Sequence, residues 1–142
     1  MFMAVVFFAA VDRLLKALAI ASQPEINLIG GWLRLVLAKN PGIAFSLPVF
    51  GRWLVIIIFL IIIALVYLFI LKIKKNAYFQ AVFYFSIIIG AASNLYDRLK
   101  YGFVIDYFNL KYYSIFNLAD GLILLGIVGL LVVVIDKNSK AC

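Results

Sequence analysis

The segment from Trp53 to Leu71 contains 19 consecutive residues without a charged side chain. An α-helix rises about 1.5 Å per residue, so a run of this length nearly crosses a hydrocarbon layer of roughly 30 Å. Lys72, Lys74 and Lys75 follow at once, and such basic clusters are typical of the cytoplasmic side of a membrane. The segment therefore predicts a transmembrane helix, and the rest of the chain must be arranged around a bilayer.

Composition extends this prediction to the whole chain. Of the 142 residues, 68% are hydrophobic and 13% are charged, whereas soluble domains are roughly half apolar and about one quarter charged. No soluble fold of this size has an interior large enough for so much apolar surface. We therefore expect one membrane domain with four spans. The spans are expected at about residues 1–20, 53–71, 77–95 and 116–135, and the outer loops at about 21–52 and 96–115.

The first of these spans is interrupted by Asp12, Arg13 and Lys16. A cleaved signal peptide is the alternative, and the small residues around Ile20 are spaced like a cleavage site. Such peptides, however, begin with basic residues and keep their apolar region free of charge. We expect a retained helix whose long charged side chains reach interfacial water. Asp12 and Lys16 lie four residues apart with the acid first, which favours a structural ion pair.

Basic residues support the orientation of the chain only through their density. With both termini inside, five of the 13 Lys and Arg residues lie on the inner side and eight on the outer side. The raw counts oppose this orientation, but the outer loops are much longer than the inner one. Density therefore places the two long loops on the extracytoplasmic side.

Several kinds of chemistry are excluded by the residues that the sequence lacks. It contains no histidine, and its single cysteine is Cys142, so a disulfide framework, a CxxC site and histidine-bound zinc are excluded. We expect no metal and no cofactor. The net charge of +7 comes from single or flanking basic residues, so we expect no nucleic-acid partner. Catalysis must then use carboxylates, hydroxyls or lysine, and a serine–lysine pair stays an alternative.

The first outer loop is more than a linker. Residues 29–50 mix apolar stretches with two turn signals, Asn40-Pro41-Gly42 and Leu47-Pro48. This pattern predicts short strands packed on the membrane face.

Three of the six acidic residues lie within 24 positions, at the outer ends of the last two expected spans: Asp97, Asp106 and Asp120. Ionisable groups at such places are costly, and they mark a functional site or have a counter-charge. Asp97 precedes Arg98, so an ion pair or a helix cap explains it. Asp106 lies among apolar residues, where a carboxyl group is inclined to keep its proton. Asp120 follows Asn117 by three residues on one helix face, where capping is the alternative to function.

Two carboxyl groups held close together in a low-dielectric site share one proton. One can then act as a general base on water while the protonated one polarises a scissile carbonyl. Asp106 and Asp120 are 14 residues apart and can meet only if the loop between them folds back. Asn94 and Asn117 could orient the pair, although hydrogen bonds between helices explain both asparagines nearly as well.

Five short motifs that occur in one order contain these residues. They are Asp12-Arg-Leu-Leu-Lys16, Asn40-Pro-Gly42-Ile-Ala44-Phe45, Gly90-Ala-Ala-Ser-Asn94-Leu-Tyr-Asp97-Arg98, Gly102-Phe-Val104-Ile-Asp106-Tyr107 and Phe116-Asn117-Leu-Ala119-Asp120. In order and spacing these motifs resemble lipoprotein signal peptidase, the type II signal peptidase of bacteria. The resemblance extends from Asp12 to about Gly126, which is nearly the whole chain.

The resemblance implies an intramembrane aspartyl endopeptidase with Asp106 and Asp120 as its catalytic residues. It also implies which residues support the site or contact substrate: Asn94, Asp97, Arg98, Asn117, Ala119, Asn40, Gly42, Asp12 and Lys16. The implied fold class is an all-α membrane protein, four transmembrane helices with a small extracytoplasmic β-element. Arg13 and Tyr107 depart from the family, which usually has glutamine and phenylalanine at these positions.

The substrate, inhibitor and location are likewise implied by the resemblance. The family removes the signal peptide of prolipoproteins just before a cysteine that carries diacylglyceryl, and the cyclic peptide globomycin blocks it. We expect a monomer in the bacterial cytoplasmic membrane, in contact with membrane lipid and with its site on the extracytoplasmic face.

Two other classes of function compete with this interpretation. In a proton- or cation-coupled carrier the acids bind ions, but carriers place such groups near the midplane and contain repeats. Here the acids cluster at one face, and the echo between Asn94-Leu-Tyr-Asp97 and Asn117-Leu-Ala-Asp120 is too short for a repeat. A membrane subunit without enzymatic activity does not explain so many polar motifs on one side. The sequence therefore favours the peptidase.

Overall fold

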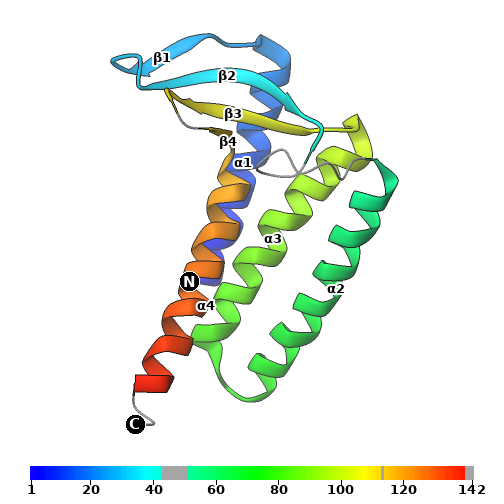
Figure 1. The fold of residues 1–142 in the computed structure, drawn as a ribbon, viewed down its shortest axis with the longest axis vertical. Helices are drawn as coiled ribbons and strands as arrows, with labels where there is room; N and C mark the ends of the chain where they lie inside the picture. The colour runs from blue at the N-terminus through cyan, green and yellow to red at the C-terminus, as the bar shows by residue number, and fades with distance from the viewer. Residues whose placement is uncertain (43–50, 113, 140–142) are drawn as a thin grey trace.

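A computed structural model describes residues 1–42, 51–112 and 114–139 of the chain. Its helices are α1 (Phe2–Ser22), α2 (Arg52–Lys74), α3 (Tyr78–Tyr101) and α4 (Leu118–Ser139). Figure 1 shows the helices side by side, with a sheet across one end of the bundle and the α2–α3 turn and the C-terminus at the other. We call the first of these the sheet end. The Leu47-Pro48 turn and the Ile43 to Phe45 part of the second motif lie outside the described residues.

Three of the described helices are long and apolar enough to cross a membrane. They are α2, α3 and the Leu118–Asp136 part of α4, so the predicted spans at 53–71, 77–95 and 116–135 correspond to apolar helices. The helix predicted at 1–20 is also present as α1, but Asp12, Arg13 and Lys16 interrupt its apolar sequence.

Four antiparallel strands form one sheet in the order β1-β2-β3-β4. β1 (Ile26–Ile29) and β2 (Leu33–Asn40) follow α1, while β3 (Val104–Leu110) and β4 (Ile115–Phe116) connect α3 to α4. The first two strands confirm that the first loop forms strands, although β1 begins before the predicted range; their packing on the membrane face stays a prediction. The other two make the β-part larger than expected, so that the protein is mostly helical rather than all-α. β2 and β3 pair over long sequence separation, with Asn40 opposite Val104 and Leu33 opposite Leu110, and no local pattern predicts such a pairing.

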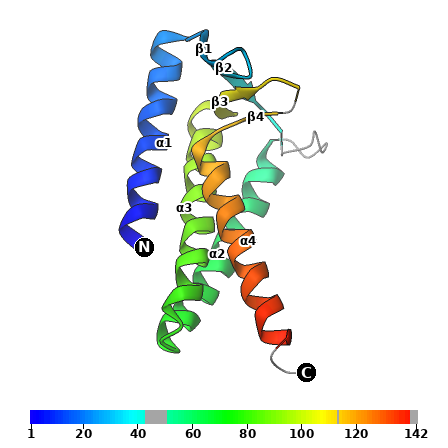
Figure 2. The same ribbon diagram turned by 90° about the vertical axis from the view of Figure 1, so that its left-hand side faces the viewer.

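Helix α3 lies at the centre of the bundle and packs against the other three helices (Figure 2). Gly90 permits its close approach to α4, because a Cβ atom at this position would lie 2.5 Å from the backbone oxygen of Ala119. Small residues commonly permit such contacts between membrane helices. In addition, the Ser86 hydroxyl donates a hydrogen bond of 2.7 Å to the Leu122 carbonyl. These contacts bring the start of α4, and with it Asp120, against the middle of α3.

The interior of the protein is polar near the sheet end, whereas the outer surface of the helices is apolar. The buried polar residues of the interior are Asp12, Lys16, Ser86, Ser93, Asn94, Asp97, Asp106 and Asn117. By contrast, of the described residues in α2 only Leu54 is fully buried, Phe69 packs against Phe2 and Phe85, and most of the other apolar side chains are exposed. Burial of charged groups is costly unless they are paired. This polar interior is therefore the part of the molecule in which a site is expected.

Candidate active site

The start of α4 is a local capping structure built from Asn117 and Asp120. The Asp120 backbone N–H donates to the Asn117 side-chain oxygen at 2.9 Å, and the Asn117 backbone N–H donates to Asp120 Oδ2 at 3.3 Å. Such reciprocal bonds satisfy backbone donors that a helix leaves free at its first turn. The capping alternative for Asp120 is thus correct for one of its oxygens. The second oxygen, Oδ1, accepts a hydrogen bond of 2.7 Å from the Asn94 amide on α3.

Asp106 lies on β3, where only 2% of its surface is exposed. Its Oδ2 accepts a hydrogen bond of 3.0 Å from the Asn40 amide, and its Oδ1 accepts one of 2.6 Å from the Asn117 amide. Burial raises the pKa of Asp106 to about 6, and the nearby charge of Asp120 acts in the same direction. The amides of Asn40 and Asn117 and the charge of Lys16 oppose this shift. The raised pKa agrees with the expectation that this carboxyl is inclined to keep its proton.

Asn117 connects the two acids. Its side-chain amide donates to Asp106, while its backbone N–H donates to Asp120. The same side chain also bonds Asn94 at 3.3 Å. The chain between Asp106 and Asp120 folds back through the β3–β4 connection, which is the condition for the two carboxyl groups to meet in one site.

A fully buried ion cluster lies behind Asn94. The Lys16 ammonium is 2.8 Å from Asp97 and 3.2 Å from Asp12, and none of the three side chains is exposed. The predicted Asp12–Lys16 pair is present. Lys16 also donates to the Asn94 side-chain oxygen at 2.8 Å. Because that oxygen faces a cation, the amide nitrogen of Asn94 is turned toward Asp120.

Asp97 does not pair with its sequence neighbours. Its salt bridges within the described residues are to Lys16 and to Arg13, which lies 2.6 Å away, and not to Arg98 or Lys100. This result corrects the interpretation from adjacent residues. For Arg98 the reason is geometric, since side chains at adjacent helix positions point in different directions, whereas α1 packs directly against α3. The Lys100 ammonium lies over the rings of Tyr96 and Tyr101 instead.

Asp12 ties three elements together through its carboxylate. It accepts hydrogen bonds from the Ser93 hydroxyl at 2.7 Å, the Tyr107 hydroxyl at 2.9 Å and the Ala119 backbone N–H at 3.2 Å. The Tyr107 hydroxyl accepts in turn from the Leu118 backbone N–H at 3.0 Å. Burial raises the pKa of Tyr107, so it remains a neutral donor.

Sequence reasoning did not single out Arg13, Ser93 and Tyr107 as members of this polar network. The one hint in the sequence was that Arg13 and Tyr107 depart from the residues that the resemblance leads one to expect at these positions. Ser93 adjoins Asn94 and had no signal of its own.

Arg98 joins the segment after β2 to α3. Its Nη2 donates to the Gly42 carbonyl at 2.8 Å and its Nη1 to the Asn94 carbonyl at 3.5 Å. The Gly42 N–H donates to the Asn40 side-chain oxygen at 3.1 Å, which orients the Asn40 amide toward Asp106. Arg98 Nε is buried and has no hydrogen-bond partner among the described residues.

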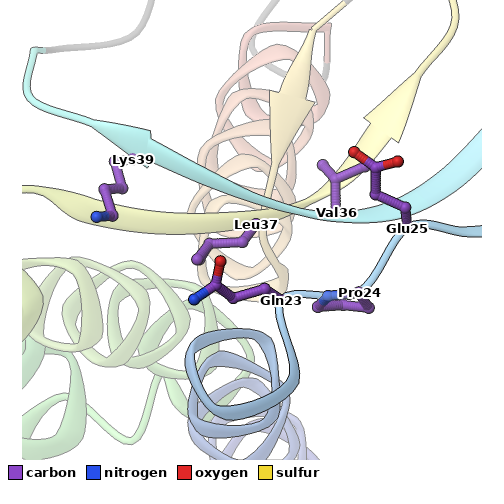
Figure 3. A pocket seen from close by; sticks show the side chains of 6 residues that line it. All are labelled: Gln23, Pro24, Glu25, Val36, Leu37 and Lys39. Atoms are coloured by element: carbon purple, nitrogen blue, oxygen red, sulfur yellow. The ribbon is translucent and has the colours of Figure 1, made fainter.

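Two cavities open near the sheet end. One, of about 450 Å³, lies between the end of α1 and β2 (Figure 3). Its lining residues are Gln23, Pro24, Glu25, Val36, Leu37 and Lys39, and none of them is a candidate site residue. The other, of about 330 Å³, lies between the start of α2 and the end of α3 and includes Arg52 and Arg98 in its lining. Only the second cavity therefore reaches a candidate residue.

The arrangement combines two buried carboxyl groups and the side-chain amides that hold both of them in place. Such a pair can take a proton from water with one member and donate a proton with the other. The described residues contain no group of three or more acidic, His or Cys side chains placed to hold a metal ion.

Comparisons with known proteins agree with one another. Residues 4–136 match the protein-family model described as Signal peptidase (SPase) II. A lipoprotein signal peptidase of Caldicellulosiruptor bescii is 36% identical over 132 residues, which cover 91% of this chain and 86% of that protein. A lipoprotein signal peptidase of Clostridium novyi is 32% identical over 145 aligned positions, which cover 95% of this chain and 97% of that protein. The solved structure of a bacterial membrane enzyme has a TM-score of 0.83 at 22% identity and covers 97% of this chain and 88% of its own.

Proposed function

The chain belongs to the signal peptidase II family of aspartic peptidases, and we propose that it removes the signal peptides of prolipoproteins with Asp106 and Asp120 as its catalytic pair. The observation that carries the assignment of the pair is the bridge through Asn117, whose amide and backbone N–H bind one acid each. Both acids thereby contact one residue, and the charge of Asp120 acts on the ionisation of Asp106. Two carboxyl groups that interact in this way titrate as a pair.

The proposed reaction uses one proton on the pair. The ionised carboxylate takes a proton from water as the water oxygen bonds to the scissile carbonyl carbon. The protonated carboxyl gives its proton to the carbonyl oxygen, which produces a neutral tetrahedral diol. The carboxyl that took the water proton then gives it to the amide nitrogen as the C–N bond breaks, and the other carboxylate takes back a proton from a hydroxyl of the diol. The products are a carboxylic acid and an amine, and the pair again holds one proton. The raised pKa of Asp106 supports a carboxyl that is protonated for part of the cycle.

The supporting residues act on this pair from two sides. Lys16 orients Asn94, and Asn94 orients Asp120. Gly42 orients Asn40, and Asn40 orients Asp106. Fixing both carboxyl groups in advance lowers the cost of reaching the transition state.

Arg98 is proposed to contact the peptide. Its buried Nε makes no hydrogen bond among the described residues, and the cavity beside it is large enough for a short extended segment. A peptide carbonyl placed there would accept from the guanidinium. Globomycin, as a cyclic peptide, is proposed to occupy the same place. The cut is proposed to fall before a cysteine that carries diacylglyceryl, with the lipid chains remaining in the bilayer.

The proposed topology has four spans, with both termini inside and the sheet end outside. The composition of α1 supports the fourth span despite its charges. Asp12 and Lys16 are fully buried against the bundle, whereas Phe7, Leu14 and Leu18 are exposed on its outer surface. A helix of this kind presents an apolar face to lipid. The protein is proposed to act as a monomer, since the pair and its supporting residues all come from one chain.

The test is cleavage by the purified protein in lipid vesicles. We expect a diacylglyceryl-modified prolipoprotein to be cut immediately before the modified cysteine, as read by mass spectrometry, and the unmodified precursor to be cut far more slowly. Globomycin should block the reaction. Ion flux across the vesicle membrane without any cleavage would instead favour the carrier, and cleavage at another bond would contradict the proposed specificity.

A further inference from the structure

One end of the sheet carries an exposed apolar and aromatic surface that no described element covers. Ile29, Trp32, Leu110 and Tyr112 form this surface, which we call the aromatic tip. Their exposed fractions include 62% for Ile29, 59% for Trp32 and 77% for Tyr112. The pairing of Ile29 with Leu33, and of Leu33 with Leu110, places the strands side by side at this end. The ring centroids of Trp32 and Tyr112 are 5.9 Å apart.

The aromatic tip projects sideways from the helices. Figure 1 shows the turn between β1 and β2 extending past α1 and α4 at the sheet end of the bundle. The apolar outer surface of α1 continues toward the same end, since Leu18 and Ile20 near its last turns are exposed. In a protein whose helices cross a bilayer, a sideways projection at one end of the bundle has lipid beside the helices within its reach.

The chemistry of the tip matches the boundary between lipid tails and headgroups. Tryptophan and tyrosine are enriched at that boundary because their rings are apolar and their N–H and O–H groups are polar. Two cations accompany them: Arg34 is exposed on β2, and the Lys111 ammonium lies 5.0 Å from the ring centroid of Tyr112. Residues 26–40 and 107–116 contain no acidic residue. A basic surface of this kind attracts the phosphates of anionic lipids.

We propose that the aromatic tip docks on the phospholipid surface at the sheet end, with the rings of Trp32 and Tyr112 at the tail–headgroup boundary and Arg34 and Lys111 on lipid phosphates. The consequence for the site follows from the strands. β2 begins beside the tip at Leu33 and ends at Asn40. β3 ends beside the tip at Leu110 and begins at Val104, two residues before Asp106. Docking therefore holds the sheet, and with it Asp106, at a set height above the bilayer.

Tryptophan fluorescence tests the docking directly, because the chain contains two tryptophans. Trp53→Phe leaves Trp32 as the sole probe, and Trp32→Phe leaves Trp53, which is exposed at the start of the membrane helix α2. Each variant is placed in vesicles of phosphatidylcholine and phosphatidylglycerol, with bromine atoms on the lipid chains either near to or far from the headgroup. We expect Trp32 emission to be blue-shifted relative to water and quenched more by the shallow bromines, as for Trp53.

Acrylamide is a quencher dissolved in the water phase, so it measures the exposure of Trp32 to water rather than to lipid. If Trp32 emission is like that of tryptophan in water, is quenched strongly by acrylamide and is unaffected by brominated lipid, the proposal is wrong. The Trp53 probe in the same vesicles shows that the protein is inserted, so that this outcome cannot result from failed reconstitution.

Two further variants separate docking from a role in folding. Trp32→Ser combined with Tyr112→Ser should lower cleavage several-fold in vesicles and leave it nearly unchanged in detergent micelles, where no lipid surface exists. An equal loss in both would mean a structural role and would contradict docking. Arg34→Gln combined with Lys111→Gln should remove any preference for anionic over zwitterionic vesicles, while a preference that persists would contradict the assigned phosphate contacts.

Discussion

The guanidinium of Arg13 lies 2.6 Å from the carboxylate of Asp97, 84 residues further along the chain. Asp97 also binds Lys16 at 2.8 Å, and Lys16 binds Asp12. The buried cluster of Asp12, Lys16 and Asp97 together with Arg13 thus contains two cations and two anions, and the formal charge of these four groups is zero. Arg13 supplies the balancing charge.

Arg13→Gln should therefore change the electrostatics of the site. The cluster becomes negative by one charge, and the influence of Lys16, which lowers the pKa of Asp106, is partly cancelled. The pKa of Asp106 should rise, so the pH dependence of kcat/KM should move to higher pH. Because Arg13 is about one third exposed, we expect a loss of only about 1 kcal/mol in the free energy of unfolding. Arg13→Lys keeps the charge and should leave the pH profile in place, whereas identical shifts in both variants would refute the electrostatic account.

Asp106→Asn and Asp120→Asn should each lower cleavage of a lipidated precursor on the order of 10²–10⁴-fold or more, because each removes one partner of the proton transfer. Both variants should still insert into membranes and show the helical circular dichroism of the parent. Asp136→Asn, at the opposite end of α4, is the matched control and should retain activity. Near-full activity in either of the first two variants would show that the assigned pair is not catalytic.

The pH dependence of cleavage follows from the raised pKa of Asp106. The proposed active form carries one proton on the pair, and the free enzyme loses this proton as the pH rises through the pKa of Asp106 at about 6. Since kcat/KM reports ionisation of the free enzyme, it should be high below this pH and decrease above it. Cleavage rates at low substrate concentration between pH 4.5 and 8.5 measure this decrease in kcat/KM. A kcat/KM that increases across the same range would contradict a requirement for the protonated form.

Gly90→Ala should disturb the contact between α3 and α4 beside the site. The added Cβ would lie 2.5 Å from the Ala119 carbonyl oxygen and 2.9 Å from the Ile123 side chain, so the helices must separate. We expect a loss of about 1–3 kcal/mol in the free energy of unfolding, as for other overpacked sites, together with reduced cleavage. Gly121→Ala adds a Cβ with no atom within 4 Å and should change neither property. Thermal unfolding in detergent compares the two, and equal effects would exclude the packing explanation.

The structural elements that are formed by residues close together in the sequence could be predicted from the sequence. The apolar run at 53–71 lies within α2, and the runs at 77–95 and 116–135 lie within α3 and α4 apart from their first one and two residues, because hydropathy is a property of consecutive residues. The Asn117 and Asp120 cap is also local, since the two residues are three apart on one turn. Motif order was sufficient to indicate the family. The β3 strand was not predicted, because its partner β2 precedes it by a whole helical hairpin.

The sequence by itself indicated that this chain lies in a membrane, where its apolar helices run, and to which family it belongs, and it is the source of the proposal that Asp106 and Asp120 are the catalytic pair. The tertiary structure alone decided that Asp97 binds Arg13 and Lys16 instead of Arg98, and that Asn117 reaches both Asp106 and Asp120. These contacts join residues on different elements, and they exist only after α1 has packed against α3 and β3 against β2. The sequence shows which charged and polar side chains will need a partner when they are buried, but the packing of helices and strands determines which partner each of them contacts.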